Sequence, residues 1–145
     1  MLRDDRQVFL NDLIVANRET VAAYEQALSH TDGGDAGETC RAQLASCRDI
    51  VARLEADLRS LGDLPGKPDE EREMLRAAGR EALSALSPRP DWEVLVDALI
   101  EHERKVVDLC GSAGALDLPD TVAKTVARCR ERAQAAIKAL GETEG

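Results

Sequence analysis

The chain has 145 residues, a length that fits one domain with its own hydrophobic core. Hydrophobic residues make up 43% of it, yet Phe, Tyr and Trp occur once each, so the core must be built from Leu, Val, Ile and Ala. The formal net charge of −9 disfavours binding to nucleic acid and to anionic membrane surfaces.

No apolar run approaches the roughly 18 residues of a membrane span, and the first residues lack the apolar core of a signal peptide. We therefore expect no membrane association, a cytoplasmic location and a single domain over residues 1–145.

The first predicted helix spans residues 4–30. Its inward row repeats every three or four residues, as one face of an amphipathic helix does. This row consists of Leu10, Leu13, Asn17, Thr20, Tyr24 and Ala27. Asn17 interrupts the middle of the row with an amide, and a buried polar group needs a hydrogen-bond partner. Asn17 therefore marks either a residue that fixes the register of a bundle or the remnant of a site.

The second predicted helix spans residues 36–62, with Gly62 suited to the position just after its end. It has the most regular apolar row of the chain, which consists of Cys40, Leu44, Cys47, Val51, Leu54, Leu58 and Leu61. A turn over 63–68 contains Pro and Gly and leads into a shorter predicted helix over 69–87, which the Pro-containing segment 87–90 ends.

The third predicted helix begins near Asp91, a good N-cap, and ends near Cys110. Its apolar face consists of Trp92, Leu95, Val96, Leu99, Val106, Val107 and Leu109. A turn over 111–118 precedes the fourth helix, whose first turn suits Pro119. The inward row of the fourth helix consists of Val122, Val126, Cys129, Ala133, Ile137 and Leu140. We expect its charged residues to lie on a solvated face and residues 141–145 to be frayed.

The lengths of the connections predict a topology. Short loops join the first helix to the second and the third to the fourth, and short loops make antiparallel hairpins. A connection of nearly thirty residues joins the two hairpins. We therefore expect an all-α, ferritin-like four-helix bundle of two antiparallel hairpins joined by a long crossover that contains a short helix.

Four cysteines lie at positions 40, 47, 110 and 129, with no Cys-x-x-Cys pair that would indicate zinc or thioredoxin chemistry. Cys40 and Cys47 would stand about 10 Å apart along one helix, beyond the roughly 7 Å limit for a disulfide. Cys110 ends one predicted helix and Cys129 lies inside the next, so we expect these two at different heights. All four are expected to be reduced and buried.

Residues 10–14, Leu-Asn-Asp-Leu-Ile, followed by Asn17 and Tyr24, are similar to the first helix of ferritin-like proteins. They most resemble a bacterial family of small ferritin-like four-helix proteins of unknown function, which share the Arg-Ser-Leu-Gly phrase found here at 59–62. The resemblance covers roughly residues 8–140, and its motifs are short and mostly structural.

The wider ferritin-like group implies a di-metal carboxylate site of iron or manganese, with Glu from two helices and Glu-x-x-His from the other two. Asn17 stands where the first helix would carry its Glu, and the second and fourth helices contain no Glu-x-x-His. The third helix keeps Glu103 near the matching position, with His102 beside it. One carboxylate cannot hold two metals, so we expect that the di-metal ligands have been lost and that no cofactor is bound.

Asn17 has two interpretations, an altered metal ligand or a core amide that is hydrogen-bonded across the bundle. Its expected partners in the second case are Tyr24, Glu103 or Gln134, and we favour this case because buried amides specify register in bundles.

His102 could form a mononuclear metal site or an acid–base pair with Glu101 or Glu103. Adjacent residues on a helix do not face each other, so we favour a histidine on the flank of the helix. Trp92 is expected to anchor the crossover or to form an interface, and His30 to interact with the C-terminal dipole of the first helix.

The leading functional hypothesis is a metal-free ferritin-like protein that serves as a structural or protein-interaction module and forms a homo-oligomer. The alternative is a metal-dependent oxidase or peroxide-handling protein that uses iron or manganese at an altered site near Asn17, His102 and Glu103. A third possibility is a binding module with a small cavity lined by Ala and Leu.

Overall fold

The computed structural model describes residues 4–31, 33–63 and 91–143. These residues form four α-helices and one short 3-10 helix, and none of them lies in a strand. The elements are α1 (Asp5–Ser29), α2 (Gly34–Ser60), α4 (Trp92–Gly111), η1 (Ser112–Ala115) and α5 (Asp120–Glu142). The predicted all-α class is confirmed for these residues, whereas the shorter helix predicted over 69–87 lies outside them.

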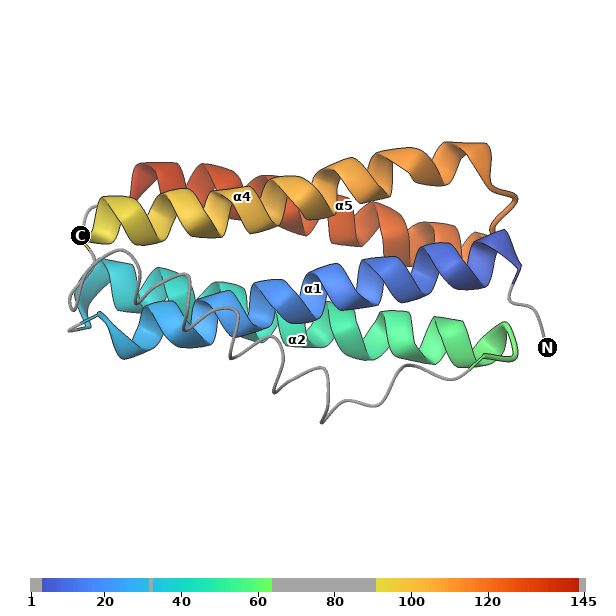
Figure 1. The fold of residues 1–145 in the computed structure, drawn as a ribbon, viewed down its shortest axis with the longest axis horizontal. Helices are drawn as coiled ribbons and strands as arrows, with labels where there is room; N and C mark the ends of the chain where they lie inside the picture. Colours follow the sequence, from blue (N-terminus) through green and yellow to red (C-terminus); the bar gives the residue numbers. More distant parts are fainter. Residues whose placement is uncertain (1–3, 32, 64–90, 144–145) are drawn as a thin grey trace.

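The four α-helices pack side by side as a bundle (Figure 1). α1 packs against α2 and α4, and α5 packs against the same two helices. Each helix runs antiparallel to the two neighbours that it contacts, so α2 and α4 point in the same direction.

Hydrogen bonds between helix ends agree with these directions. Thr39 near the start of α2 shares a hydrogen bond of 3.0 Å with the hydroxyl of Thr143, which follows α5. The indole of Trp92 at the start of α4 donates to the carbonyl of Thr143 at 3.1 Å. At the other end of the bundle, the Gln7 side chain near the start of α1 donates to the Leu61 carbonyl after α2 at 2.9 Å. The end of α2 and the start of α4 therefore lie at opposite ends of the bundle.

The ends of the first hairpin are fixed by local signals. Asp4 and Gln7 form a capping box at the start of α1, in which each side chain accepts the backbone N–H of the other at 2.9 Å. Gly62 follows α2 with a φ of +84°, as its predicted position requires. The backbone N–H of Asp63 then donates to the Leu58 carbonyl at 3.2 Å and closes the turn.

Two predicted details of the second hairpin are wrong. Pro119 lies one residue before α5 instead of within its first turn. α5 continues to Glu142, although residues 141–145 were expected to be frayed; residues 144 and 145 lie outside the described part of the chain. The reason is that Thr143 is tied down by Trp92 and Thr39, which hold the last turn of α5 against the starts of α4 and α2.

The inward row predicted for α1 is confirmed, because all six of its residues are buried. The row predicted for α2 differs at two positions. Ile50 is buried where Val51 was expected, and Val51 and Leu61 are only partly buried. Ala136 likewise takes the buried position expected for Ile137 on α5. In α2 the buried row follows the 3.6-residue period of a straight helix instead of a strict heptad. In α5 the buried row is a strict heptad, which the expected Ile137 would have broken.

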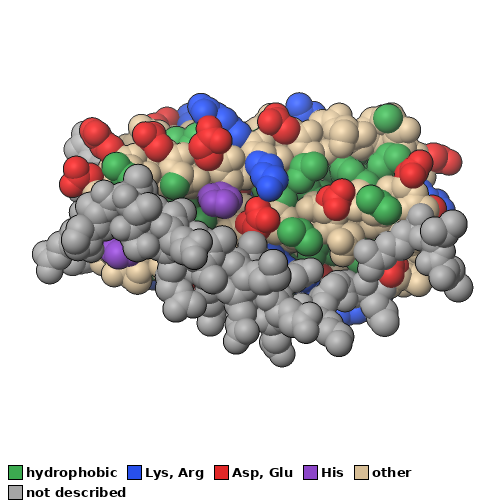
Figure 2. All heavy atoms as spheres, in the orientation of Figure 1, with side chains coloured by type: hydrophobic (Ala, Val, Ile, Leu, Met, Phe, Trp, Pro, Cys, Tyr) green, Lys and Arg blue, Asp and Glu red, His purple; other side chains and the backbone are tan. Residues whose placement is uncertain are grey.

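Along the described residues, no helix combines the length and apolar character that crossing a membrane would require. Figure 2 shows acidic and basic side chains among hydrophobic ones on one face of the described residues.

Candidate functional site

A layer of buried polar side chains divides the core into two apolar clusters. Asn17 and Thr20 on α1 lie between the clusters, and Glu103 does so on α4. All three side chains have no exposed surface. Polar groups at the centre of a bundle are costly unless they are paired, so their partners decide what this layer can do.

Glu103 is the charged residue of the layer, and two helices supply its partners. The Tyr24 hydroxyl of α1 donates to its Oε2 at 2.9 Å. The Arg132 guanidinium of α5 donates to its Oε1 and forms an ion pair with it. The Arg132 side chain is only 7% exposed, so this ion pair lies within the bundle. Both oxygens of the carboxylate are therefore occupied by donors from the protein itself.

Arg132 also binds α2, the one helix of the bundle that the contacts of Glu103 do not include. Its Nη1 donates to the side-chain oxygen of Gln43 on α2 at 3.3 Å. Tyr24, Glu103, Arg132 and Gln43 thus form a hydrogen-bonded chain that includes one residue from every α-helix of the described part. Such a network specifies how the four helices sit against one another.

The electrostatics of the pair follow from its burial. Burial raises the pKa of the Glu103 carboxyl, and the opposite charge of Arg132 and its hydrogen bond work against that rise. Burial also disfavours the charged guanidinium, but Cys47 and Glu103 outweigh it and raise the pKa of Arg132. The guanidinium therefore remains a permanent cation beside the carboxylate. Burial, reinforced by Glu103, raises the pKa of the Tyr24 hydroxyl, which stays a donor.

Asn17 is a buried core amide, as we favoured, but its expected partners were wrong. Its Nδ2 donates to the Leu13 carbonyl at 2.8 Å and to the Cys129 sulfur at 3.4 Å. Tyr24 and Glu103 pair with each other instead, and Gln134 is exposed. The bond to the preceding turn satisfies the amide locally, so Asn17 does not need the carboxylate that its position suggested.

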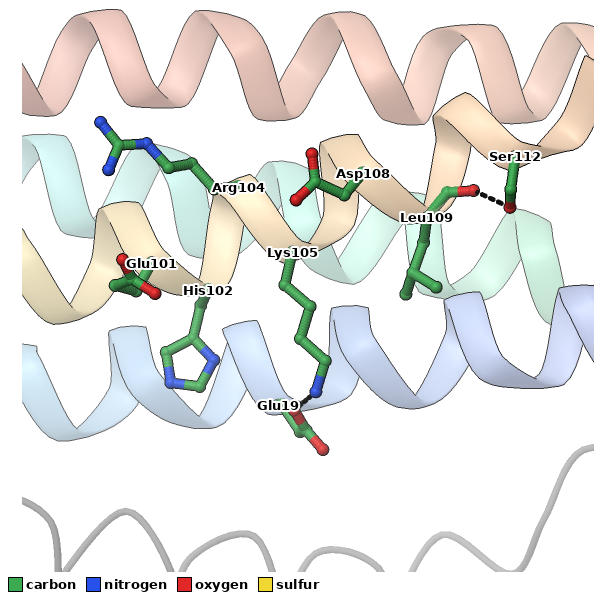
Figure 3. Close-up of a pocket in the computed structure, with 8 residues that line it drawn as sticks. All are labelled: Glu19, Glu101, His102, Arg104, Lys105, Asp108, Leu109 and Ser112. Carbon is green, nitrogen blue, oxygen red and sulfur yellow. Dashed lines mark hydrogen bonds and ion pairs between the residues drawn. The ribbon is translucent and has the colours of Figure 1, made fainter.

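His102 lies on the flank of α4, as we favoured, and lines an open groove of about 670 Å³ between α4 and α1. Figure 3 shows its ring directed toward α1, near Lys105, whose ammonium contacts Glu19 at 3.2 Å. Burial lowers the pKa of His102. Glu101 lines the same groove, but Glu103 points into the core, so His102 and Glu103 do not form a joint site.

The cysteines are all buried and carry free thiols, in agreement with their predicted burial. Burial raises the pKa of Cys40 to about 11 and that of Cys47 to about 12. Cys110 and Cys129, which we expected at different heights, belong to the same apolar cluster of the core.

The predicted candidates for metal binding are therefore dispersed. Asn17 faces Cys129, Glu103 faces Arg132 and Tyr24, and His102 faces a surface groove. Within the three ranges that the structure describes, no group of three or more His, Cys, Asp and Glu side chains is arranged to hold a metal ion.

The residue that sequence reasoning missed is Arg132. We expected the charged residues of the fourth helix to be solvated, and this was wrong for Arg132, which is turned into the bundle. Its spacing of three from the inward Cys129 was a usable signal, because residues three apart share a helix face. The chain matches no family model, and comparisons with characterised proteins and with solved structures also find no match.

Proposed function

We propose that this protein is a metal-free member of the ferritin-like bundles and that it serves as a structural or protein-interaction module. The observation that carries this proposal is the buried ion pair between Arg132 and Glu103. A carboxylate at the centre of a bundle needs a positive charge, and here α5 supplies it as a guanidinium.

The chemistry of this pair argues against a di-metal centre at the same place. Such a centre takes carboxylates from all four helices and His from two of them. At this level α5 provides a cation, α2 provides the amide of Gln43 and α1 provides the phenol of Tyr24. A divalent cation bound to Glu103 would lie beside a permanent like charge in a medium that screens it poorly.

The directions of the helices support the ferritin-like part of the proposal. α2 ends at one end of the bundle and α4 begins at the other, so the connection between them joins opposite ends (Figure 1). Two antiparallel hairpins joined in this way are typical of ferritin-like bundles, whereas an up-down-up-down bundle joins neighbouring ends.

Elemental analysis tests the metal-free assignment. The protein would be purified from cultures supplemented with iron and manganese, alongside Glu103→Gln as the variant that removes the buried charge. We expect much less than one metal ion per chain in both proteins. Stoichiometric iron or manganese in the natural protein that disappears in Glu103→Gln would overturn the proposal in favour of the metal-dependent alternative.

The interaction role rests on the resemblance to ferritin-like bundles, which often pair through a flat helical face. We therefore propose a second copy of the chain as the first partner to test. Light scattering over a range of concentrations should show a dimer. A monomer at every concentration would remove self-association from the proposal.

A further inference from the structure

The side of α2 opposite its buried row carries exposed side chains. The buried row packs against α1 and α5. On the opposite side, four exposed residues are spaced by seven, so they lie close to one line along the helix. This line consists of Glu38, Ala45, Ala52 and Arg59. Together with the exposed Arg48 and Asp49 at its centre, the line is termed the outer face of α2.

The charge of this helix surface suits contact with a second copy of the chain. Two copies of a chain with a net charge of −9 repel each other. The exposed residues of α2 include four arginines and three acidic residues, whereas those of α4 include two basic and four acidic residues. A second copy is therefore repelled less at α2 than at α4.

The order of the charges on the outer face is self-complementary. If two copies of α2 lie antiparallel, with a two-fold axis between positions 48 and 49, each Arg48 faces the partner's Asp49. The same axis sets each Glu38 against the partner's Arg59. A parallel pairing in register would instead bring every charge against its own kind. The charge pattern therefore favours one direction and one register.

Two small residues lie within the antiparallel pairing. The same axis sets each Ala45 against the partner's Ala52, between the central charges and the outer ones. Small side chains let two helix axes approach to roughly 8 Å. This close approach brings the longer charged side chains of the two copies within reach of each other. Because alanine offers little apolar surface, the charges decide whether and how the two helices pair.

The central charges have only exposed contacts within the chain. The Arg48 guanidinium lies 3.9 Å from the Glu25 carboxylate, and the Asp49 carboxylate accepts a hydrogen bond of 3.1 Å from Arg53. The side chains of Arg48 and Asp49 are 54% and 66% exposed. Exposed ion pairs contribute little to stability, so both side chains can exchange these contacts for a partner.

We propose that the outer face of α2 is the surface through which two copies of this chain form an antiparallel dimer. The proposal rests on the self-association proposed above and adds its surface, direction and register. The interface is isologous, because the two-fold axis brings the same residues of both copies together. Each charge pair therefore occurs twice in the dimer.

Charge reversals at the centre test the pairing by analytical ultracentrifugation. Arg48→Asp places only carboxylates around the axis, and Asp49→Arg places only guanidiniums there. Each variant alone should have a dissociation constant raised by about tenfold or more, because like charges meet twice. An equal mixture of the two variants should recover the dimer, because the carboxylates of one chain then meet the guanidiniums of the other. Native mass spectrometry should identify these dimers as mixed.

Arg128→Asp, at an exposed position of α5, is the matched control and should retain the natural dissociation constant. Circular dichroism would establish that each variant is folded. If the natural protein is a dimer, undiminished association of Arg48→Asp and Asp49→Arg, or failure of their mixture to form mixed dimers, would overturn the α2 surface and leave self-association standing. A natural protein that is monomeric at every concentration would remove both.

The outer charges test the direction of the pairing. Glu38→Arg should weaken the dimer severalfold, because its new guanidinium meets the partner's Arg59. Adding Arg59→Glu to the same chain should restore the natural dissociation constant, because both positions then meet opposite charges again. In a parallel dimer positions 38 and 59 would not meet. A natural dimer whose dissociation constant is unchanged by Glu38→Arg would therefore contradict the antiparallel register.

Discussion

Among single residues, the buried carboxylate of Glu103 determines which groups must lie around it. A fully buried carboxylate loses its hydration and must recover that free energy from donors and an opposite charge. Tyr24 and Arg132 provide both. Asn17, the polar residue that stands out most in the sequence, is satisfied separately by the Leu13 carbonyl and the Cys129 sulfur.

Replacing Tyr24 by Phe tests the donor from α1. The substitution removes one hydrogen bond to a charged group, so we expect the free energy of unfolding to fall by about 1.5–3 kcal/mol. Urea denaturation measures this change. Thr20→Val is the matched control, because the buried Thr20 hydroxyl donates only to the Ala16 carbonyl of its own helix at 2.9 Å. A smaller loss for Tyr24→Phe than for Thr20→Val would contradict the role given to Tyr24.

His102 makes stability depend on pH. Burial lowers the pKa of His102 in the folded protein. In the unfolded chain its pKa is about 6.5, so just below that pH the imidazole is protonated in the unfolded chain but still neutral in the folded one. Its contribution to stability is therefore present above that pH and is lost as the pH falls through the folded pKa. His102→Gln should flatten the pH dependence of the melting temperature in this range.

Gln134→Ala, at an exposed position of α5, is the control for this measurement, because it changes no titratable group. It should leave the slope of the natural protein intact. An unchanged slope in His102→Gln would refute the assignment.

At the level of helices, each helix end is fixed either by residues next to it in the sequence or by hydrogen bonds to the end of another helix. The capping box at Asp4 and the left-handed Gly62 act within their own hairpin. Thr143 instead joins the end of α5 to α2 and α4. This difference explains why the end of α2 was predicted well and the end of α5 was not.

Gly62→Ala tests the left-handed turn after α2. A side chain at a φ of +84° is strained, so we expect a loss of about 1–2 kcal/mol in the free energy of unfolding. Gly141→Ala is the control, because this glycine lies in α5 with open space around its Cβ position. There Ala should stabilise the helix by up to about 1 kcal/mol. Equal effects of the two substitutions on the melting temperature would be inconsistent with this account of the turn.

The sequence predicted the helices and most of their buried rows, because apolar spacing and end signals are local properties. It did not predict the partners of Asn17 or the inward position of Arg132. Both depend on how each helix is rotated about its axis within the bundle, which the sequence does not specify. A single charged residue beside an apolar row can lie either inside the bundle or on the solvent-exposed side of the helix.

For the whole molecule, the parallel directions of α2 and α4 are the property that distinguishes the topologies. Nitroxide labels attached through azide-bearing amino acids at positions 59 and 93 would leave the native cysteines untouched. These exposed positions lie at the end of α2 and the start of α4, so we expect a separation on the order of 40 Å, the length of α2. Labels at positions 38 and 93 should be roughly 15–20 Å apart. An up-down-up-down bundle would reverse the order of the two distances.

Whether Arg132 supplies the charge that Glu103 needs is measured most directly by a double-mutant cycle. Glu103→Met and Arg132→Met should each lower the free energy of unfolding by about 3–5 kcal/mol, because each leaves the other charge buried and unpaired. Arg128→Met, at an exposed position of the same helix, should change it by less than about 0.5 kcal/mol. The double variant should recover much of the loss, with a coupling energy of at least about 2 kcal/mol. Single effects that simply add would contradict the proposal that a guanidinium takes the place of a metal at the centre of this bundle.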